Sequence, residues 1–398
     1  MAAITFDFNQ VLVFRVAAVI AAIFIVASRA YADLVFTSVV VIVRHEKPPT
    51  SVRFCRLGNT QIISETALNS KVGRGVLYSC QMDIDAINAA RELIAPYVKR
   101  TPLARSQALS DRLGTGIYVK YELFQKTGSF KPRGAFNKLL NMTPGERAKG
   151  VVAVSGGNHA QAVAYASKTL GVDAVIVMPE NTPRNYLDAT RGYGAEVELR
   201  PNIADAFARI ADYEAEGRTF LHPFDDPLII AGQGTVGLEI LEDVPDVTDI
   251  VVSIGGGGLA GGVTIAAKAA NSGIRVWGVE TVGADAMSKA LEAGHPVTLD
   301  AITSIAKTLG APYVTDRTLA LVQQHLESVT VVTDQEAVAA LKFIAERLKV
   351  LTEPSASCTL AAAEMLKGNF TPDSRVVLIF CGGNVSLDDV CGYIGVDN

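Results

Sequence analysis

The sequence has few cysteines and no long run of charge of one sign. Its five cysteines (Cys55, Cys80, Cys358, Cys381 and Cys391) include no CxxC pair. An odd number of cysteines without such a pair disfavours both a disulfide framework and a zinc site. This cysteine content suits a reducing cytoplasm. Lysine and arginine number 36 against 41 acidic residues, for a formal net charge of -5, and no long basic patch stands out. Nothing in this balance indicates nucleic-acid binding.

An apolar run long enough to span a bilayer is also lacking in the N-terminal part. Val16–Ala27 and Leu34–Val43 are apolar, but neither reaches the ~20 uninterrupted residues of a spanning helix. Ala30-Tyr31-Ala32 has the A-x-A pattern of a signal-peptidase site. The sequence changes character at Met82. We expect residues 1–81 to be a non-catalytic extension, either a targeting segment or translated upstream or cloning sequence, with no membrane association of the remainder.

What the sequence does contain is a lysine held at the start of a helical run. In Gly128-Ser129-Phe130-Lys131-Pro132-Arg133-Gly134-Ala135, the lysine stands directly before a proline. Proline fixes its own φ and suits the first turn of a helix, so Lys131 is held just ahead of that turn. A held, partly desolvated lysine has a lowered pKa and can attack an aldehyde as an amine nucleophile. From this octet alone, a surface lysine ahead of a helix is an equal alternative.

Three glycine-containing loops each follow an apolar, strand-like run. They are Ser155-Gly156-Gly157-Asn158-His159 after Val151–Val154, Gly255-Gly256-Gly257-Gly258-Leu259 after Asp249–Ile254, and Cys381-Gly382-Gly383-Asn384 after Arg375–Phe380. Four consecutive glycines before a helix leave main-chain N–H groups bare, which favours a phosphate over a simple tight turn. The pattern is not GxGxxG, and no acidic residue is placed to hold a ribose, so a dinucleotide is disfavoured.

Strand-like and helical segments alternate from Met82 onward. This alternation predicts parallel strands joined by helical crossovers, an α/β fold. The expected helices are 84–98, 183–191, 203–216, 235–241, 259–270, 337–348 and 358–367. Gln233-Gly234-Thr235 is interpreted as a helix start.

These motifs, in this order, make the sequence closely resemble the fold type II pyridoxal-phosphate enzymes, in the branch of threonine/serine dehydratases and serine racemases. The resemblance runs from about Met82 to the C-terminus. It implies two open, twisted, mainly parallel sheets flanked by helices, the tryptophan synthase β-like fold. It also implies a large cofactor-binding domain (82–149 and 228–398), a small mobile domain (150–227), pyridoxal 5′-phosphate as cofactor, and a homodimer or homotetramer.

The resemblance also implies which residues form the site. The catalytic residues would be Lys131, Ser155 and Glu353; the cofactor-binding residues Lys131, Phe130, Asn158, Gly255, Gly256, Gly257, Gly258, Leu259 and Cys381; and the substrate-binding residues Ser155, Gly156, Gly157, Asn158 and His159. For several of these residues a purely structural role is an open alternative. Ser155 or Asn158 could merely cap a helix, Cys381 could be a small buried hydrophobe, and Glu353 could be a charge at a helix N-terminus. His159 is more simply a packed residue than a base.

The activity implied is removal of water and ammonia from L-threonine or L-serine, leaving a 2-oxo acid. Serine racemases have a serine where this sequence has Gly156, so two-sided proton exchange at Cα is disfavoured. Racemisation, dehydration of another hydroxy-amino acid, β-replacement synthesis and a non-catalytic binding role remain the alternatives. Glu280 matches part of a divalent-metal site of relatives, but position 286 is Ala instead of Asp, and we expect no metal.

Overall fold

The computed structural model describes residues 5–6, 41–43, 62–64 and 82–395, which fall into two compact units, 1–81 and 82–398. In the first unit, the strands β1 (Thr5–Phe6), β2 (Val41–Val43) and β3 (Ile62–Ser64) pair in parallel. The apolar run 16–27, the motif at 30–32 and most of the run 34–43 lie outside the described residues. Within the described ranges, no helix combines the length and apolar character needed to cross a membrane.

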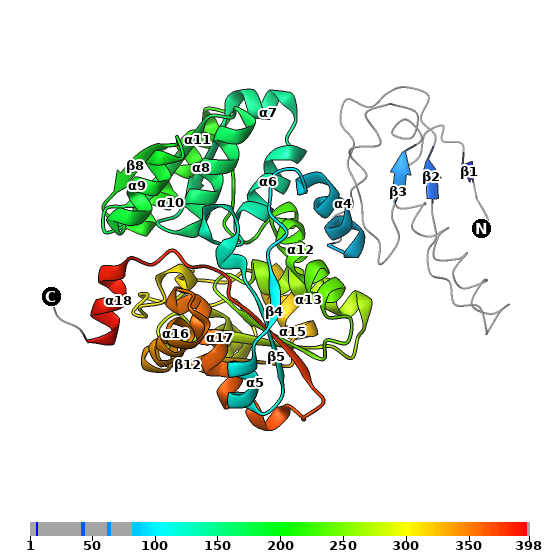
Figure 1. Ribbon diagram of the computed structural model, residues 1–398. Coiled ribbons are helices and arrows are strands. Elements are labelled where there is room, and N and C mark those ends of the chain that lie inside the picture. Colours follow the sequence, from blue (N-terminus) through cyan, green and yellow to red (C-terminus); the bar gives the residue numbers. More distant parts are fainter. Residues whose placement is uncertain (1–4, 7–40, 44–61, 65–81, 396–398) are drawn as a thin grey trace. The chain divides into compact units, whose positions relative to one another are not determined.

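The second unit contains a six-stranded sheet in the order β12-β11-β10-β13-β5-β4 (Figure 1). Its strands are β4 (Leu103–Arg105), β5 (Gly116–Lys120), β10 (Asp249–Ser253), β11 (Arg275–Thr281), β12 (Ser328–Val332) and β13 (Arg375–Ile379). All neighbours are parallel except the edge pair β4–β5. The central strands are rich in valine and isoleucine and are buried along their length, as expected for parallel strands covered on both faces.

A second sheet, in the order β8-β7-β6-β9, is wholly parallel. Its strands are β6 (Val151–Val154), β7 (Ala174–Pro179), β8 (Glu196–Arg200) and β9 (Thr219–Phe220). Alternate residues of β6 enter different cores: Val151 and Ala153 pack with α6 and α8, whereas Val152 and Val154 pack with α10 and α11. This period of two places helices on both faces of the sheet, which they surround at the upper left of Figure 1.

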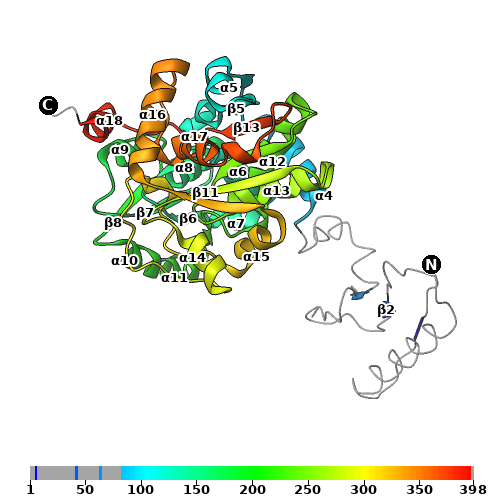
Figure 2. The same cartoon turned by 90° about the horizontal axis from the view of Figure 1, so that it is seen from below.

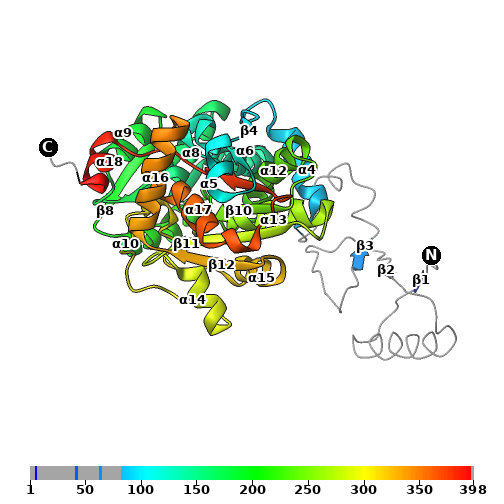
Figure 3. The same ribbon diagram turned by 60° about the horizontal axis from the view of Figure 1, so that its bottom comes forward.

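Helices connect the strands of both sheets. They are α4 (Ile84–Ile94), α5 (Gln107–Leu113), α6 (Pro132–Asn141), α7 (Pro144–Lys149), α8 (Asn158–Leu170), α9 (Arg184–Gly192), α10 (Ile203–Ala208), α11 (Ile210–Ala215), α12 (Pro227–Asp243), α13 (Gly258–Ala270), α14 (Ala286–Ala293), α15 (Asp316–His325), α16 (Asp334–Leu348), α17 (Pro354–Met365) and α18 (Leu387–Ile394), with 3-10 turns at Glu122–Phe124, Lys126–Gly128, Lys307–Leu309 and Lys367–Asn369. Helix α17 packs on β10 and β11 (Figure 3). The expected α/β class with two mainly parallel sheets is confirmed.

The expectation of a helix start at 233–235 is wrong. Helix α12 begins at Pro227, where Asp226 caps it, and residues 233–235 lie in its middle. The glycines there serve packing: a Cβ on Gly232 would lie 2.5 Å from the Arg133 carbonyl oxygen, and one on Gly234 would lie 2.9 Å from the Gly262 carbonyl oxygen. Because these glycines have no side chains, α12 packs closely against α6 and α13 (Figure 2).

Other element boundaries also differ from expectation. Helix α4 ends at Ile94, not at 98, and the expected helix 203–216 is divided at Arg209 into α10 and α11. Helices α16 and α17 begin three and four residues earlier than expected, because Thr333 caps α16 and Pro354 occupies the first turn of α17. These starts put Glu353 at the N-cap of α17.

Candidate active site

Lys131 stands at the N-cap of α6, with Pro132 in the first turn, as its sequence neighbours predict. Its amine donates a hydrogen bond to the Pro223 carbonyl oxygen at 2.8 Å and lies 5.2 Å from the centre of the Phe130 ring. The residue is only partly buried as a whole, but its amine lines an internal pocket. Burial lowers the pKa of Lys131 to about 8, although Cys381 and Glu353 act in the opposite direction. Near neutral pH the amine is therefore still mostly protonated, but its neutral fraction is larger than that of an ordinary lysine.

The tetraglycine turn joins β10 to α13 and lines the same pocket. Among the described residues, no acceptor is found for the main-chain N–H groups of Gly255 to Leu259. These amides lie at the N-terminus of a 13-residue helix, where the helix dipole also favours an anion. Amides in this arrangement can hold an anion such as a phosphate.

Three of the four glycines in this turn leave no room for a side chain. A Cβ on Gly256 would lie 2.2 Å from the Phe224 ring, and one on Gly258 would lie 2.8 Å from the Phe224 carbonyl oxygen. Gly257 has φ +94° and would place a Cβ 2.8 Å from Thr318. Both the left-handed backbone and the close packing require glycine here.

Glu353 is a buried carboxyl with neutral hydrogen-bond partners. It is 2% exposed, its Oε1 accepts from Asn158 Nδ2 at 2.8 Å, and none of the described lysine, arginine or histidine side chains forms an ion pair with it. Burial raises the pKa of Glu353 to about 7, while hydrogen bonds from Ser355, Asn158 and other neighbours oppose that rise. The group can therefore exchange a proton near neutral pH.

Cys381 follows β13 and is 4% exposed, with its thiol 3.5 Å from the Ser355 carbonyl oxygen. Burial raises the pKa of its thiol well above the ordinary value, so the group stays neutral. It is a weak donor only.

The loop at 155–159 reaches the pocket through one residue. Asn158 lines the pocket, whereas Ser155, Gly156, Gly157 and His159 do not. Ser155 accepts from the Gly157 N–H at 3.1 Å, as a residue at a turn would. His159 Nε2 lies 2.9 Å from the Leu221 carbonyl oxygen, which can only accept, so Nε2 carries the proton. Burial and nearby Lys131 lower the pKa of His159 to about 3, which keeps the ring neutral.

The pocket gathers most of the residues expected from the sequence, from five separate segments. Its lining is Phe130, Lys131, Asn158, Pro223, Phe224, Gln233, Ser253, Gly255, Gly256, Gly257, Gly258, Leu259, Thr308, Leu309, Glu353, Ser355 and Cys381. Pro223, Phe224, Thr308 and Ser355 were not predicted. Pro223 and Phe224 follow a two-residue strand, and Thr308 lies in the short 3-10 turn Lys307–Leu309, so neither segment is long enough to carry a periodic signal.

Behind Lys131, four charged side chains form what we call the ion cluster: Lys120, Glu122, Arg133 and Glu239. The Arg133 guanidinium lies 2.8 Å from Glu122 Oε1 and 2.7 Å from Glu239 Oε1, and the Lys120 amine lies 2.5 Å from Glu239 Oε2. All four side chains are at most 9% exposed. Two cations and two anions balance in this cluster. Arg133 joins α6 to the 3-10 turn Glu122–Phe124 and to α12, and it does not line the pocket.

Glu280, expected as a remnant of a metal site, caps a helix. Its oxygens accept from the Met287 N–H at 2.9 Å, from the Ser288 N–H at 2.8 Å and from the Ser288 hydroxyl at 2.7 Å. Within the described part of the chain, no three His, Cys, Asp or Glu side chains gather in the manner of a metal site.

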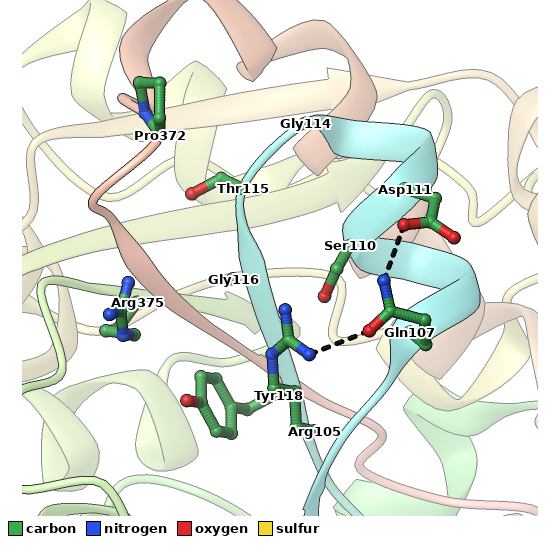
Figure 4. Close-up of a pocket in the computed structure, with 10 residues that line it drawn as sticks. All are labelled: Arg105, Gln107, Ser110, Asp111, Gly114, Thr115, Gly116, Tyr118, Pro372 and Arg375. Carbon is green, nitrogen blue, oxygen red and sulfur yellow. Dashed lines mark hydrogen bonds between the residues drawn. The ribbon is translucent and has the colours of Figure 1, made fainter.

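A larger, open hollow lies on the outer side of β5 and α5 (Figure 4). It is lined by Arg105, Gln107, Ser110, Asp111, Gly114, Thr115, Gly116, Tyr118, Pro372 and Arg375, and it shares no residue with the lysine pocket. In Figure 4, Arg105 donates to Gln107, which in turn donates to Asp111, so these polar groups satisfy one another. None of the expected site residues lies there.

Comparison with known proteins identifies the family. Residues 94–382 match the family model described as pyridoxal-phosphate dependent enzyme. The chain belongs to this family. It is 39% identical to an L-threonine ammonia-lyase of Thermotoga maritima, over 77% of this chain and 76% of the relative. It is 38% identical to the catabolic L-threonine dehydratase TdcB of Escherichia coli, over 80% of this chain and 98% of the relative.

A solved structure of similar fold supports the same family. Maize serine racemase has a TM-score of 0.75 and 38% sequence identity, and the match covers 79% of this chain and 97% of that one. The cofactor of the family is pyridoxal phosphate. The pocket fits it, because its lining includes main-chain amides at a helix N-terminus that have no acceptor among the described residues, and an amine whose pKa is lowered to about 8.

Proposed function

We propose that this chain is an ammonia-lyase that converts L-threonine, L-serine or both to a 2-oxo acid and ammonia. The single observation that carries the proposal is the pocket shared by the Lys131 amine and the tetraglycine turn. It occurs in a chain that is 38% identical to a catabolic L-threonine dehydratase over 98% of that protein. A β-hydroxy-amino acid is the substrate class that this relative's name supports.

Lys131 would hold the cofactor and then serve as the base that takes the Cα proton of the substrate. Bound pyridoxal phosphate supplies an aldehyde for amines and a ring that withdraws electrons from Cα. The lowered pKa suits Lys131 to this work, because an amine that is partly neutral near neutral pH can accept a proton. Gly255 to Leu259 would hold the phosphate through main-chain amides.

The loop before α8 would bind the substrate carboxylate. The main-chain N–H groups of Gly156, Asn158 and His159 have no acceptor among the described residues, and they lie at the start of a 13-residue helix. Such amides favour an anion. Ser155 holds the turn through Gly157. His159 would support this loop as a neutral packed residue, not as a base.

Glu353 and Cys381 would set the protonation of the pocket. Cys381 stays neutral and offers only a weak donor to the cofactor ring. Glu353 has a pKa of about 7 and would hold or release a proton beside the cofactor. Cys381 therefore adds no charge near the Lys131 amine, whereas the charge of Glu353 changes with pH around neutrality.

Racemisation is the second candidate, because maize serine racemase has a similar fold. The absence of a side chain at Gly156 weighs against it. The resemblance places a serine there in racemases, and a Cβ at this position would lie 2.7 Å from the Thr182 hydroxyl, which would have to rotate away. Proton exchange from the side opposite Lys131 therefore lacks its expected group.

We further propose that residues 150–227, which contain the second sheet, move as a small domain against 82–149 and 228–398 to admit substrate. We propose a homodimer or homotetramer acting in the cytoplasm, with residues 1–81 taking no part in catalysis. Size-exclusion chromatography with light scattering, and activity of a chain starting at Met82, test these points.

The activity test is direct. The purified holoenzyme is supplied with a panel of β-hydroxy-amino acids, and 2-oxo acid, ammonia and D-amino acid are quantified. We expect 2-oxo acid and ammonia in equal amounts from L-threonine or L-serine. D-serine without 2-oxo acid would establish a racemase, and bound cofactor without any turnover would establish a non-catalytic binding protein.

A further inference from the structure

The loop after β13 contains a polar residue that the proposed function does not use. Of Cys381-Gly382-Gly383-Asn384, only Cys381 lines the cofactor pocket. Asn384 lines a second, smaller chamber, which shares Glu353 with that pocket. The Asn384 side chain is nevertheless hydrogen-bonded to Asn158, which does line the cofactor pocket.

The Asn384 side chain has one orientation that satisfies its neighbours. Its Nδ2 lies 2.7 Å from the Thr127 carbonyl oxygen, and because that oxygen can only accept, the amide must present its nitrogen there. The same nitrogen donates its other proton to Asn158 Oδ1, also at 2.7 Å. Both N–H groups of the Asn384 amide are therefore used, one on the main chain and one on Asn158.

The orientation of Asn384 determines that of Asn158. Because Asn158 Oδ1 accepts from Asn384, the Nδ2 of Asn158 lies at the other end of its amide, where it donates to Glu353 Oε1 at 2.8 Å. An amide nitrogen has two N–H groups, and no acceptor for the second is found among the described residues. Asn158 is 5% exposed, so this second N–H is available to an acceptor on a molecule bound in the pocket.

Two glycines leave room for this series of hydrogen bonds. A Cβ on Gly128 would overlap the Asn384 amide, with its nitrogen only 3.2 Å away. A Cβ on Gly382 would overlap Glu353 Oε1 and lie 3.1 Å from Asn158 Nδ2. A side chain at either glycine would therefore displace one of the bonded partners.

Both ends of Asn384 are held in place. Its side chain bonds to Thr127, which has φ +63°, a left-handed conformation that is costly for a β-branched residue and persists only where the surroundings hold it. Its main-chain oxygen accepts from the hydroxyl of Tyr186, a residue of α9 that is 6% exposed. Asn384 is thus a fixed donor toward Asn158.

We propose that Asn384 is a positioning residue that holds the Asn158 amide with its N–H groups toward Glu353 and the cofactor pocket. The ring oxygen and the phosphate oxygens of pyridoxal phosphate accept hydrogen bonds, so a donor holds them and a carbonyl oxygen repels them. A reversed Asn158 amide would present its oxygen to the pocket and to Glu353 Oε1. A residue outside the pocket therefore decides which end of Asn158 a bound cofactor meets.

The test uses the full-length protein. Fluorescence titration measures its affinity for pyridoxal phosphate, and the absorption spectrum of the bound cofactor is recorded. Asn384→Leu keeps a side chain of similar size and removes both donors. We expect its dissociation constant for pyridoxal phosphate to rise about three- to tenfold, the loss of about one hydrogen bond. Asn158→Leu should raise it at least as much, and both variants should shift the spectrum in the same direction.

The double variant with Asn158→Leu and Asn384→Leu separates positioning from a general structural role. If Asn384 acts through Asn158, the dissociation constant of the double variant should lie within about twofold of that of Asn158→Leu. Effects that multiply would overturn the proposal, because Asn384 would then act through the turn at Thr127. An affinity that Asn384→Leu leaves unchanged, or spectral shifts of opposite direction, would overturn it as well.

The matched control is Asn141→Leu. The Asn141 side chain also donates twice, to the main-chain oxygen and to Oδ1 of Asn137, but it is exposed at the far end of α6. We expect no change in affinity or spectrum, and a loss as large as that of Asn384→Leu would overturn the proposal. If Asn384→Leu does not fold, Asn384→Ala should weaken cofactor binding in the same way, and an unchanged affinity there would overturn the proposal.

This inference depends on the cofactor and not on the ammonia-lyase activity. Protein that is inactive on threonine and serine but shows the non-additive loss of affinity would refute only the activity. Active enzyme in which the two losses multiply would refute only the role of Asn384.

Discussion

Buried ionisable groups lie on two sides of the start of α6. They form ion pairs on one side and none on the other. The ion cluster behind Lys131 buries two cations and two anions, each in direct contact with an opposite charge. The pocket in front buries Lys131 and Glu353 without an ion pair, and their pKa values move toward neutrality, to about 8 and about 7. Buried charges that form ion pairs hold neighbouring elements together, whereas buried ionisable groups without an ion pair can exchange protons near neutral pH.

The largest expected effect tests the pocket side. Lys131→Ala should lower turnover by about 10³-fold or more, because it removes the amine that would hold the cofactor and then act as the base. It should not lower the melting temperature of the cofactor-free protein, because the amine has no ion-pair partner to leave behind. Steady-state assays and thermal unfolding measure the two quantities. A variant that turns over at the parent rate would remove Lys131 from the chemistry.

Arg133→Met tests the other side. It leaves the buried carboxylates of Glu122 and Glu239 without their shared cation, so the free energy of unfolding should fall by about 3–5 kcal/mol. Urea unfolding measures the change. The control is Arg184→Met, because the Arg184 side chain is 91% exposed in its pair with Asp188 and its loss should cost at most about 0.5 kcal/mol. Equal losses in both variants would contradict the contrast between the two sides.

The pH dependence of stability should have opposite signs on the two sides. Burial raises the pKa of Glu353 from 4.5 to about 7, so its neutral form contributes stability that is complete below pH 4.5 and is lost as the pH rises through 7. Relative to Glu353→Gln, the wild type should lose about 2 kcal/mol between pH 5 and pH 8. Arg133 and Lys120 lower the pKa of Glu239, so its contribution is lost as the pH falls. Unfolding curves at several pH values measure these changes. If the free energy of unfolding of the wild type and of Glu353→Gln varied with pH in parallel, this assignment would be wrong.

The smallest effect concerns how the pocket keeps its space. Gly256→Ala would place a Cβ 2.2 Å from the Phe224 ring, and overpacking of this kind costs about 1–3 kcal/mol. We expect pyridoxal phosphate to bind about tenfold more weakly, as measured by fluorescence titration. Adding Phe224→Ala should restore part of the affinity. Gly368→Ala, where nothing lies within 4 Å of the new Cβ, is the matched control; a loss of the same size there would remove the steric explanation.

Local chemistry made the motifs predictable, but not their surroundings. The proline after Lys131 and the four glycines at 255–258 act within a few residues of themselves, and both motifs lie where the sequence predicts. The prediction at Gly234 was wrong, because a glycine is needed there for close packing against the helix around Gly262, more than twenty residues away in the sequence. Tyr186 and Phe224 reach the site through tertiary packing alone, and neither has a local pattern that marks it.

The sequence alone determined the α/β class, the lysine at a helix start and the turn that can hold a phosphate, because each depends on backbone geometry set by neighbouring residues. The tertiary structure alone decided which buried charges are paired. Lys131 and Arg133 are two residues apart, yet one meets a carbonyl oxygen and the other meets two carboxylates. Successive positions at a helix start point in different directions, and what each side chain meets there comes from distant strands and helices.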